Sequence, residues 1–156
     1  MMILPHGTLA PGFSLPDQFG RSVSLHDFRG STAVALVFFP FAFSRTCQGE
    51  LGALRDEPDL FHDAGVQLIG VSVDSKFALR AWSEEQGYDF PLLADFWPHG
   101  EVARAYGAFL DERGHAARAT FVIDDAGVIR AGFQSAPGEP RTIEQYRRAL
   151  EALRSH

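Results

Sequence analysis

The sequence has a single cysteine, Cys47, among its 156 residues. One cysteine excludes an internal disulfide, and it excludes a dithiol site that is oxidised and reduced within one chain. Any redox chemistry in this protein would therefore begin at Cys47 and be completed by another molecule.

Positive charge and long apolar runs are also scarce. The 14 Lys and Arg residues against 20 Asp and Glu residues give a net charge of −6, which argues against a surface for nucleic acid. The longest apolar run is far shorter than the roughly 20 residues of a membrane helix, and residues 1–11 lack the features of a signal peptide. We therefore expect a cytoplasmic protein with a reduced thiol and with neither membrane nor nucleic acid as partner.

Signals for a metal or a cofactor are missing as well. The six histidines show no spacing typical of metal ligands, and no glycine-rich phosphate loop follows any expected strand. The sequence thus predicts neither a bound metal nor a cofactor. What it does contain, 46% hydrophobic and 22% charged residues, is typical of one globular domain, which we expect to span residues 1–156.

The hydrophobic pattern predicts an N-terminal hairpin followed by alternating strands and helices. The hairpin is expected over residues 13–27, the strands over 33–39, 66–73, 92–93, 119–123 and 128–133, and the helices over 44–62, 75–86, 101–106 and 142–153. Ser75 and Thr142 can cap their helices, Gly87 can close one, and Pro58 should end or kink the first. This order predicts a thioredoxin-like α/β fold: a mixed sheet with helices on both faces and an added N-terminal β-hairpin.

Cys47 follows the apolar strand at the point where a helix begins. Pro40 ends the strand and forces a loop, and the free N–H groups of the helix's first turn favour an anion. Ser44 lies one turn before Cys47, where its hydroxyl can cap the helix or donate to a bound oxygen. A lone cysteine is also often a small buried hydrophobic residue, and on that alternative Cys47 would be inert.

The spacing of Ser44 and Cys47 resembles a redox Cys-x-x-Cys motif whose first cysteine is replaced by serine. Such a site can attack a substrate but cannot close its own disulfide. This pattern favours a one-cysteine peroxidase or a thiol sensor over a dithiol shuttle.

Four segments in the same order resemble the peroxiredoxin family, and together they cover the chain to about residue 150. They are Phe38-Phe39-Pro40-x-x-x-Ser44-x-x-Cys47-x-x-Glu50-Leu51, residues 10–15 with 23–30, residues 70–75, and residues 118–124. Residues 43–51, together with 95–100, are similar to the AhpE-type subgroup of one-cysteine peroxiredoxins.

The resemblance implies a function and a role for each site residue. Cys47 would attack a peroxide oxygen and become a sulfenic acid. Ser44 would hold the peroxide, Pro40 would shield the thiolate, and Arg118 would lie beside the sulfur and polarise the peroxide. The expected substrates are hydrogen peroxide, organic hydroperoxides or peroxynitrite. The expected partners are an external thiol or a redoxin as reductant and a second copy of the chain in a homodimer.

Ionising the thiol cannot supply most of the catalysis. A free thiol is already a few per cent ionised at pH 7, so full ionisation gains roughly 30-fold at most. Enzymes typically accelerate reactions by about a millionfold or more. We therefore expect alignment of the peroxide, and donors aimed at its leaving oxygen, to supply the remainder. Arg118, Ser44 and the backbone N–H of Cys47 are the predicted donors.

Several alternatives stay open at this point. Arg45 is either a second cation near the thiol or a surface residue. Glu50 either orients a site arginine or lies exposed on the helix. Trp97 packs beside the site, at a subunit contact, or elsewhere in the core or on the surface. A redox sensor that passes its oxidation state to a partner protein could use the same thiol. An inert structural module predicts a sulfur closed off from solvent and no reaction with peroxide.

Overall fold

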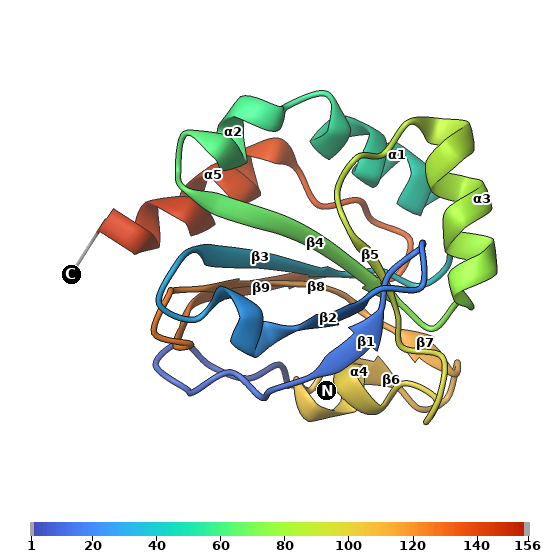
Figure 1. Cartoon of the computed structure of the whole chain (residues 1–156), viewed down its shortest axis with the longest axis horizontal. Helices are drawn as coiled ribbons and strands as arrows, with labels where there is room; N and C mark the ends of the chain where they lie inside the picture. The colour runs from blue at the N-terminus through green and yellow to red at the C-terminus, as the bar shows by residue number, and fades with distance from the viewer. Residues whose placement is uncertain (1, 155–156) are drawn as a thin grey trace.

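The computed structural model describes residues 2–154 and has a five-stranded sheet at its centre (Figure 1). The strands, in spatial order, are β5 (Leu92–Ala94), β4 (Val66–Ser72), β3 (Ala33–Phe38), β8 (Arg118–Ile123) and β9 (Ile129–Ser135). Strands β3, β4 and β5 are parallel, whereas β8 is antiparallel to both β3 and β9. Because Phe38 pairs with Ala119, the carboxyl end of β3 lies beside the first residues of β8.

Helices cover both faces of this sheet, as predicted (Figure 1). One face carries α1 (Arg45–Arg55), α2 (Pro58–His62), α3 (Lys76–Gln86) and α5 (Ile143–Glu151), which continues as η2 (Ala152–Arg154). The other face carries α4 (Glu101–Ala105), the hairpin β1 (Ser14–Pro16) and β2 (Ser22–Ser24), and the short helix η1 (Leu25–Phe28). Within residues 2–154, no helix is both long and apolar enough to cross a membrane.

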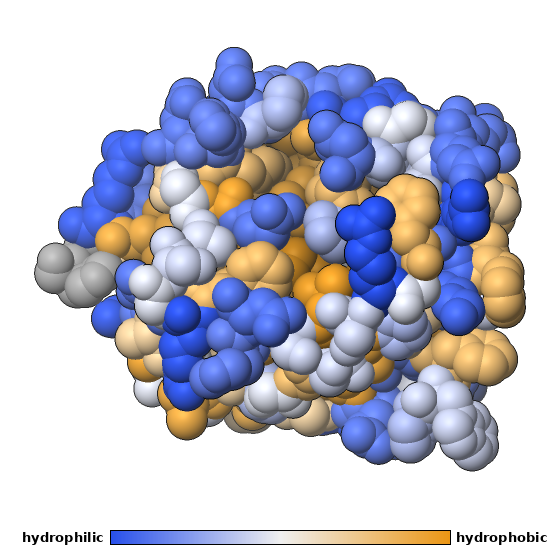
Figure 2. Space-filling view, in the orientation of Figure 1, coloured by the Kyte–Doolittle hydropathy of each residue, from blue (hydrophilic) through white to orange (hydrophobic). Residues whose placement is uncertain are grey.

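Strand β3 is apolar along its whole length because both of its faces are covered. Leu36 and Phe38 belong to the core under the hairpin and α4, whereas Val37 and the next residue, Phe39, belong to the core under the helical layer. In Figure 2, hydrophobic residues lie over the sheet between the helical layer and the hairpin, while the outer surface of the helices is mostly hydrophilic. The two cores thus hold the end of β3 rigidly on both sides.

Most of the predicted element boundaries are confirmed, with three differences. The helix expected over 44–62 is two helices, because Pro58 occupies the first turn of α2. The expected hairpin is present as β1 and β2, but its last residues, from Leu25, form η1 instead of continuing the second strand. A short pair, β6 (Phe109–Leu110) and β7 (His115–Ala116), was not predicted, since strands of two residues have no readable alternation. Ser75 and Thr142 cap their helices, and Gly87 closes α3 in the left-handed conformation.

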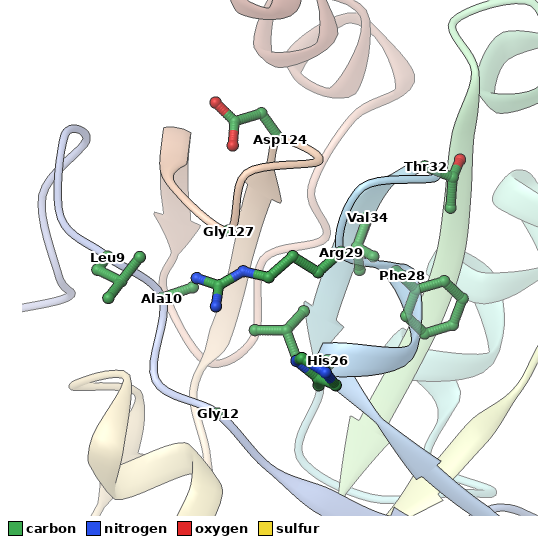
Figure 3. Close-up of a pocket in the computed structure, with 11 residues that line it drawn as sticks. Leu9, Ala10, Gly12, His26, Phe28, Arg29, Thr32, Val34, Asp124 and Gly127 are labelled. Carbon is green, nitrogen blue, oxygen red and sulfur yellow. The ribbon is translucent and has the colours of Figure 1, made fainter.

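A cavity of about 220 Å³ lies at the start of β3, between the N-terminal segment, η1 and the β8–β9 turn (Figure 3). Three of its polar side chains have partners within the chain. Arg29 donates to a carbonyl of the β8–β9 turn, Thr32 donates to a carbonyl just before β4, and Asp124 accepts from amides of its own turn. Cys47 does not line this cavity. The thiol instead lies beyond the opposite, carboxyl end of β3.

Candidate active site

Cys47 is the third residue of α1, and its exposed fraction is 0%. The helix begins at Arg45, because the loop after β3 turns at Pro40 and places Ser44 directly before the first turn. On burial alone, Cys47 fits the inert alternative, which predicted a covered sulfur. Cys47 belongs to the apolar core under the helical layer, but its sulfur also accepts a hydrogen bond from the guanidinium of Arg118, and this distinguishes it from a cysteine packed only among apolar side chains.

Arg118 is the cation beside the thiol. Its Nη1 donates to Cys47 Sγ at 3.2 Å, and its Nε donates to the carbonyl of Pro137 at 2.6 Å. Arg118 is the first residue of β8, and the pairing of Phe38 with Ala119 brings it to the carboxyl end of β3. The antiparallel register therefore places this guanidinium next to the first turn of α1, although 71 residues separate it from Cys47.

Glu50 holds Arg118 in place. Its Oε1 accepts from Arg118 Nη1 at 2.7 Å, and the carboxylate is almost fully buried one turn after Cys47. The structure thus places Glu50 against a site arginine rather than on the exposed side of the helix. Burial alone would raise the pKa of Glu50, but hydrogen bonds and charge from Arg141, with the charge of Arg118, lower the pKa below its ordinary value.

A second arginine, Arg141, was not predicted from the sequence. Its backbone N–H and Nε donate to Glu50 Oε2 at 2.6 and 2.9 Å, and its Nη2 donates to Glu50 Oε1 at 3.0 Å. Its Nη1 donates to Thr120 Oγ1 at 3.0 Å. Arg141 lies between β9 and α5, 91 residues from Glu50, in no motif that marks a site. Its place directly before the capping residue Thr142 was the only local signal.

These charges do not cancel among themselves. Arg118 and Arg141 contribute two positive charges and Glu50 contributes one negative charge, which leaves one net positive charge beside the sulfur. A buried charge without a counter-charge is costly. The arrangement therefore favours an anion at this position, whether a thiolate or a charged oxygen of a bound molecule.

Ser44 carries an unpaired hydroxyl at the start of the same helix. Its side chain makes no cap hydrogen bond. Among residues 2–154, Ser44 Oγ is the one buried side-chain nitrogen or oxygen atom that has no hydrogen-bond partner. The structure thus lacks the capping contact that was one of the two predicted uses of this hydroxyl. Pro40 is buried in the loop before it.

Three aromatic residues and one arginine lie near Cys47 in the sequence, and they differ in how far they are buried. Phe39 is buried against Trp82, so ordinary core packing explains it, whereas Phe41 and Phe43 are 41% and 49% exposed. Arg45 is exposed, in agreement with the surface alternative. Trp97, further along the chain, is 79% exposed and so is not a core residue.

Comparisons with known proteins identify the family to which the chain belongs. Residues 6–132 match the AhpC/TSA family. Alkyl hydroperoxide reductase E of Mycobacterium tuberculosis is 44% identical over 147 residues, which cover 94% of this chain and 96% of that protein. A thioredoxin peroxidase of Echinococcus granulosus is 35% identical over 94% of this chain and 80% of that protein.

Solved structures give the same result for the fold. AhpC of Enterococcus faecalis superimposes with a TM-score of 0.87 at 29% identity, covering 99% of this chain and 94% of that chain. The peroxidoxin BcpB of Mycobacterium tuberculosis gives 0.84 at 27% identity, covering 97% of each chain. These matches confirm the predicted thioredoxin-like fold. The chain therefore belongs to the AhpC/TSA family of peroxiredoxins, as a member with a single cysteine.

Proposed function

We propose that the protein reduces hydrogen peroxide, organic hydroperoxides or peroxynitrite at Cys47, and that an external thiol or redoxin restores the enzyme. The observation that supports this most is the hydrogen bond of 3.2 Å from Arg118 Nη1 to Cys47 Sγ. Arg118, Arg141 and Glu50 together carry one net positive charge beside the sulfur. A thiolate at Cys47 supplies the missing negative charge. The thiolate, and not the thiol, is the nucleophile.

In the proposed reaction the thiolate attacks one oxygen of the peroxide. A sulfur–oxygen bond forms, the O–O bond breaks, and the sulfur is oxidised to a sulfenic acid. The other oxygen leaves as hydroxide or alkoxide, which takes up a proton from solvent to give water or an alcohol, or it leaves as part of nitrite when the substrate is peroxynitrite. Negative charge moves from the sulfur to the leaving oxygen. Arg118 is the cation that can stabilise the charge on the leaving oxygen. It is buried, and its hydrogen bonds to Glu50 and to the carbonyl of Pro137 fix its orientation.

Ser44 is the proposed ligand of the peroxide before the bond breaks. Its buried hydroxyl has no partner within the described chain, so it is free to donate to one peroxide oxygen and accept from the other. Pro40 limits access from the side of the loop and leaves no N–H there to compete. We infer that Ser44, Arg118 and the N–H of Cys47 align the peroxide, which agrees with the need for more than thiol ionisation.

The sulfenic acid must be resolved from outside, because the chain has no second cysteine. We propose that one thiol forms a mixed disulfide with Cys47 and releases water, and that a second thiol releases the enzyme. A reducing, cytoplasmic setting and a homodimer are part of the same proposal. Excess peroxide would carry Cys47 on to sulfinic acid.

The proposal is tested by mixing the reduced protein with hydrogen peroxide in a stopped-flow fluorimeter. Trp82 reports through its contact with Gln48 of α1, and mass spectrometry should show one added oxygen, with Cys47→Ser as the inert control. We expect a rate far above that of free cysteine, and repeated turnover when thiol is in excess. A rate no faster than free cysteine would refute the enzyme, and oxidation without turnover would instead favour the sensor.

Two arginines provide a matched comparison for the role of the cation. Arg118 contacts the sulfur, whereas Arg45 lies two residues from Cys47 in sequence but is exposed. We expect Arg118→Ala to lower the rate of sulfenic acid formation by about 100-fold, since a donor to developing charge is removed. Arg45→Ala should leave the rate within about twofold. An Arg118→Ala rate within threefold of the native rate would contradict the assignment.

A further inference from the structure

The loop of residues 40–44 connects β3 to α1 and carries both Pro40 and Ser44. Its geometry therefore determines where the Ser44 hydroxyl and the first turn of α1 lie. One side chain holds its backbone: the carboxylate Oδ2 of Asp74 accepts from the N–H of Ala42 at 2.7 Å. Within residues 2–154, no other side chain is hydrogen-bonded to the backbone of this loop.

Asp74 is itself fixed by the end of the sheet. The hydroxyl of Ser72, the last residue of β4, donates to the same Oδ2 at 2.6 Å and accepts from the N–H of Asp74 at 3.3 Å. Ser72 is buried, and the residue after Asp74, Ser75, caps α3. Asp74 thus lies between two rigid elements, which suits a group that positions a third.

The loop needs such a contact because part of its backbone is strained. Phe43, directly before Ser44, has φ of 67°, in the left-handed region that disfavours residues with a Cβ. Its side chain is half-exposed, and its ring lies toward the buried ring of Trp82, with 6.2 Å between the ring centroids. If the bond to Ala42 were lost, Phe43 could relax to an ordinary conformation, and the relaxation would move Ser44.

We propose that Asp74 is a positioning residue that holds the 40–44 loop in the conformation in which Ser44 can bind the peroxide and the sulfur of Cys47 stays covered. This inference rests on the proposed function, because it names the group that keeps the peroxide ligands in place. In the part of the chain that the structure describes, the Asp74 carboxylate is hydrogen-bonded to Ala42 and Ser72 and not to Cys47 or Arg118, so it acts through the backbone of the loop. Loss of the Asp74 carboxylate should therefore change the rate at which Cys47 reacts with peroxide and the rate at which it is alkylated in opposite directions.

The experiment compares those two reactivities in the whole protein. One is oxidation of Cys47 by hydrogen peroxide, which needs the aligned donors, and the other is alkylation by iodoacetamide, which needs an accessible thiolate but not the donors that align a peroxide. Asp74→Ala should lower the oxidation rate by about 10- to 100-fold, as expected for a small misplacement of catalytic groups. The same substitution should raise the alkylation rate several-fold. Asp74→Asn, whose amide oxygen still accepts a hydrogen bond, should give smaller changes in the same directions.

Asp17→Ala is the matched control. Asp17 also accepts backbone N–H groups with its carboxylate, from Phe19 and Arg21, but it holds the turn between β1 and β2. We expect it to leave the ratio of the two rates unchanged. An unchanged ratio in Asp74→Ala would overturn the inference, as would a fall of both rates together.

The experiment distinguishes failure of the inference from two other outcomes: a variant that does not fold and a protein that is not a peroxidase. If circular dichroism shows that Asp74→Ala does not fold, the ratio measured for Asp74→Asn decides: a shift in the expected direction supports the inference, and no shift overturns it. If the native protein reacts with peroxide no faster than free cysteine, the proposed function fails. Alkylation of the same variants still tests whether Asp74 holds the loop closed.

Discussion

At the scale of single residues, Ser44 combines a position typical of a helix cap with a hydroxyl that caps nothing. At a working cap, replacing serine by alanine costs about 1 kcal/mol of stability. Here the buried hydroxyl has no partner, so its removal also removes an unsatisfied polar group, which by itself is costly by about 1–3 kcal/mol. We therefore predict that Ser44→Ala leaves the free energy of unfolding unchanged or raises it, while the rate of oxidation by peroxide falls at least tenfold.

Urea unfolding and stopped-flow oxidation of the same Ser44→Ala sample check this prediction. Ser44→Thr is the conservative control, because threonine keeps the hydroxyl and should retain most of the rate. A loss of stability with no loss of rate would show that the hydroxyl serves the fold and not the peroxide.

Glu50 gives a prediction about acid. Its pKa in the folded protein lies below its ordinary value of 4.5, so the carboxylate contributes stability that is present above that value and is lost as the pH falls through the lowered pKa. Glu50→Gln leaves two buried guanidinium groups without their carboxylate, which should cost about 3–5 kcal/mol at pH 7. As the pH falls below 4.5 and then through the lowered pKa, the native carboxyl also becomes neutral, and the difference should shrink.

Urea unfolding of both proteins at a series of pH values from 7 to about 3 measures that difference. Because other carboxyl groups titrate in both proteins, only the difference between the two curves reports Glu50. A difference that stays constant over this range would show that the ionised state of Glu50 does not stabilise the fold.

At the scale of elements, the sequence predicted what is local and missed what depends on tertiary contact. Strand β3 and the helices α3 and α5 carry their own signals, as apolar runs and as capping residues such as Thr142. The strands β6 and β7 are two residues each, and their residues Phe109 and Ala116 belong to the same apolar core as α4. No local pattern could have shown them.

The same division applies to the site. Cys47, Ser44 and Pro40 could be predicted because they share one loop and one helical turn, and Arg118 because the resemblance marked it. Arg141 could not, since its role arises only where the β9–α5 connection meets a carboxylate of α1. Burial of the sulfur was considered only as part of the inert alternative, and its full burial next to a guanidinium depends on tertiary contacts that no local pattern reveals.

At the scale of the whole molecule, the charged group around the sulfur joins elements that are distant in sequence. Glu50 belongs to α1, Arg118 to β8 and Arg141 to the connection before α5, and all three are buried. A rigid centre of this kind suits a small oxidant, but the covered sulfur must open to a larger thiol. We therefore expect the step with peroxide to be faster than the step with thiol, so that the oxidised enzyme accumulates during turnover.

The single cysteine fixes the stoichiometry of that turnover. After one equivalent of peroxide and no thiol, we expect one sulfenic acid per chain, trapped by dimedone as a single adduct on Cys47, and no disulfide. A small monothiol should then give a mixed disulfide, and a second molecule of it should regenerate the enzyme, so that two thiols are consumed per peroxide. Mass spectrometry of the intact protein follows each species. A disulfide between two chains that forms quantitatively before any thiol is added would contradict this scheme, because the second sulfur would then come from another copy of the protein.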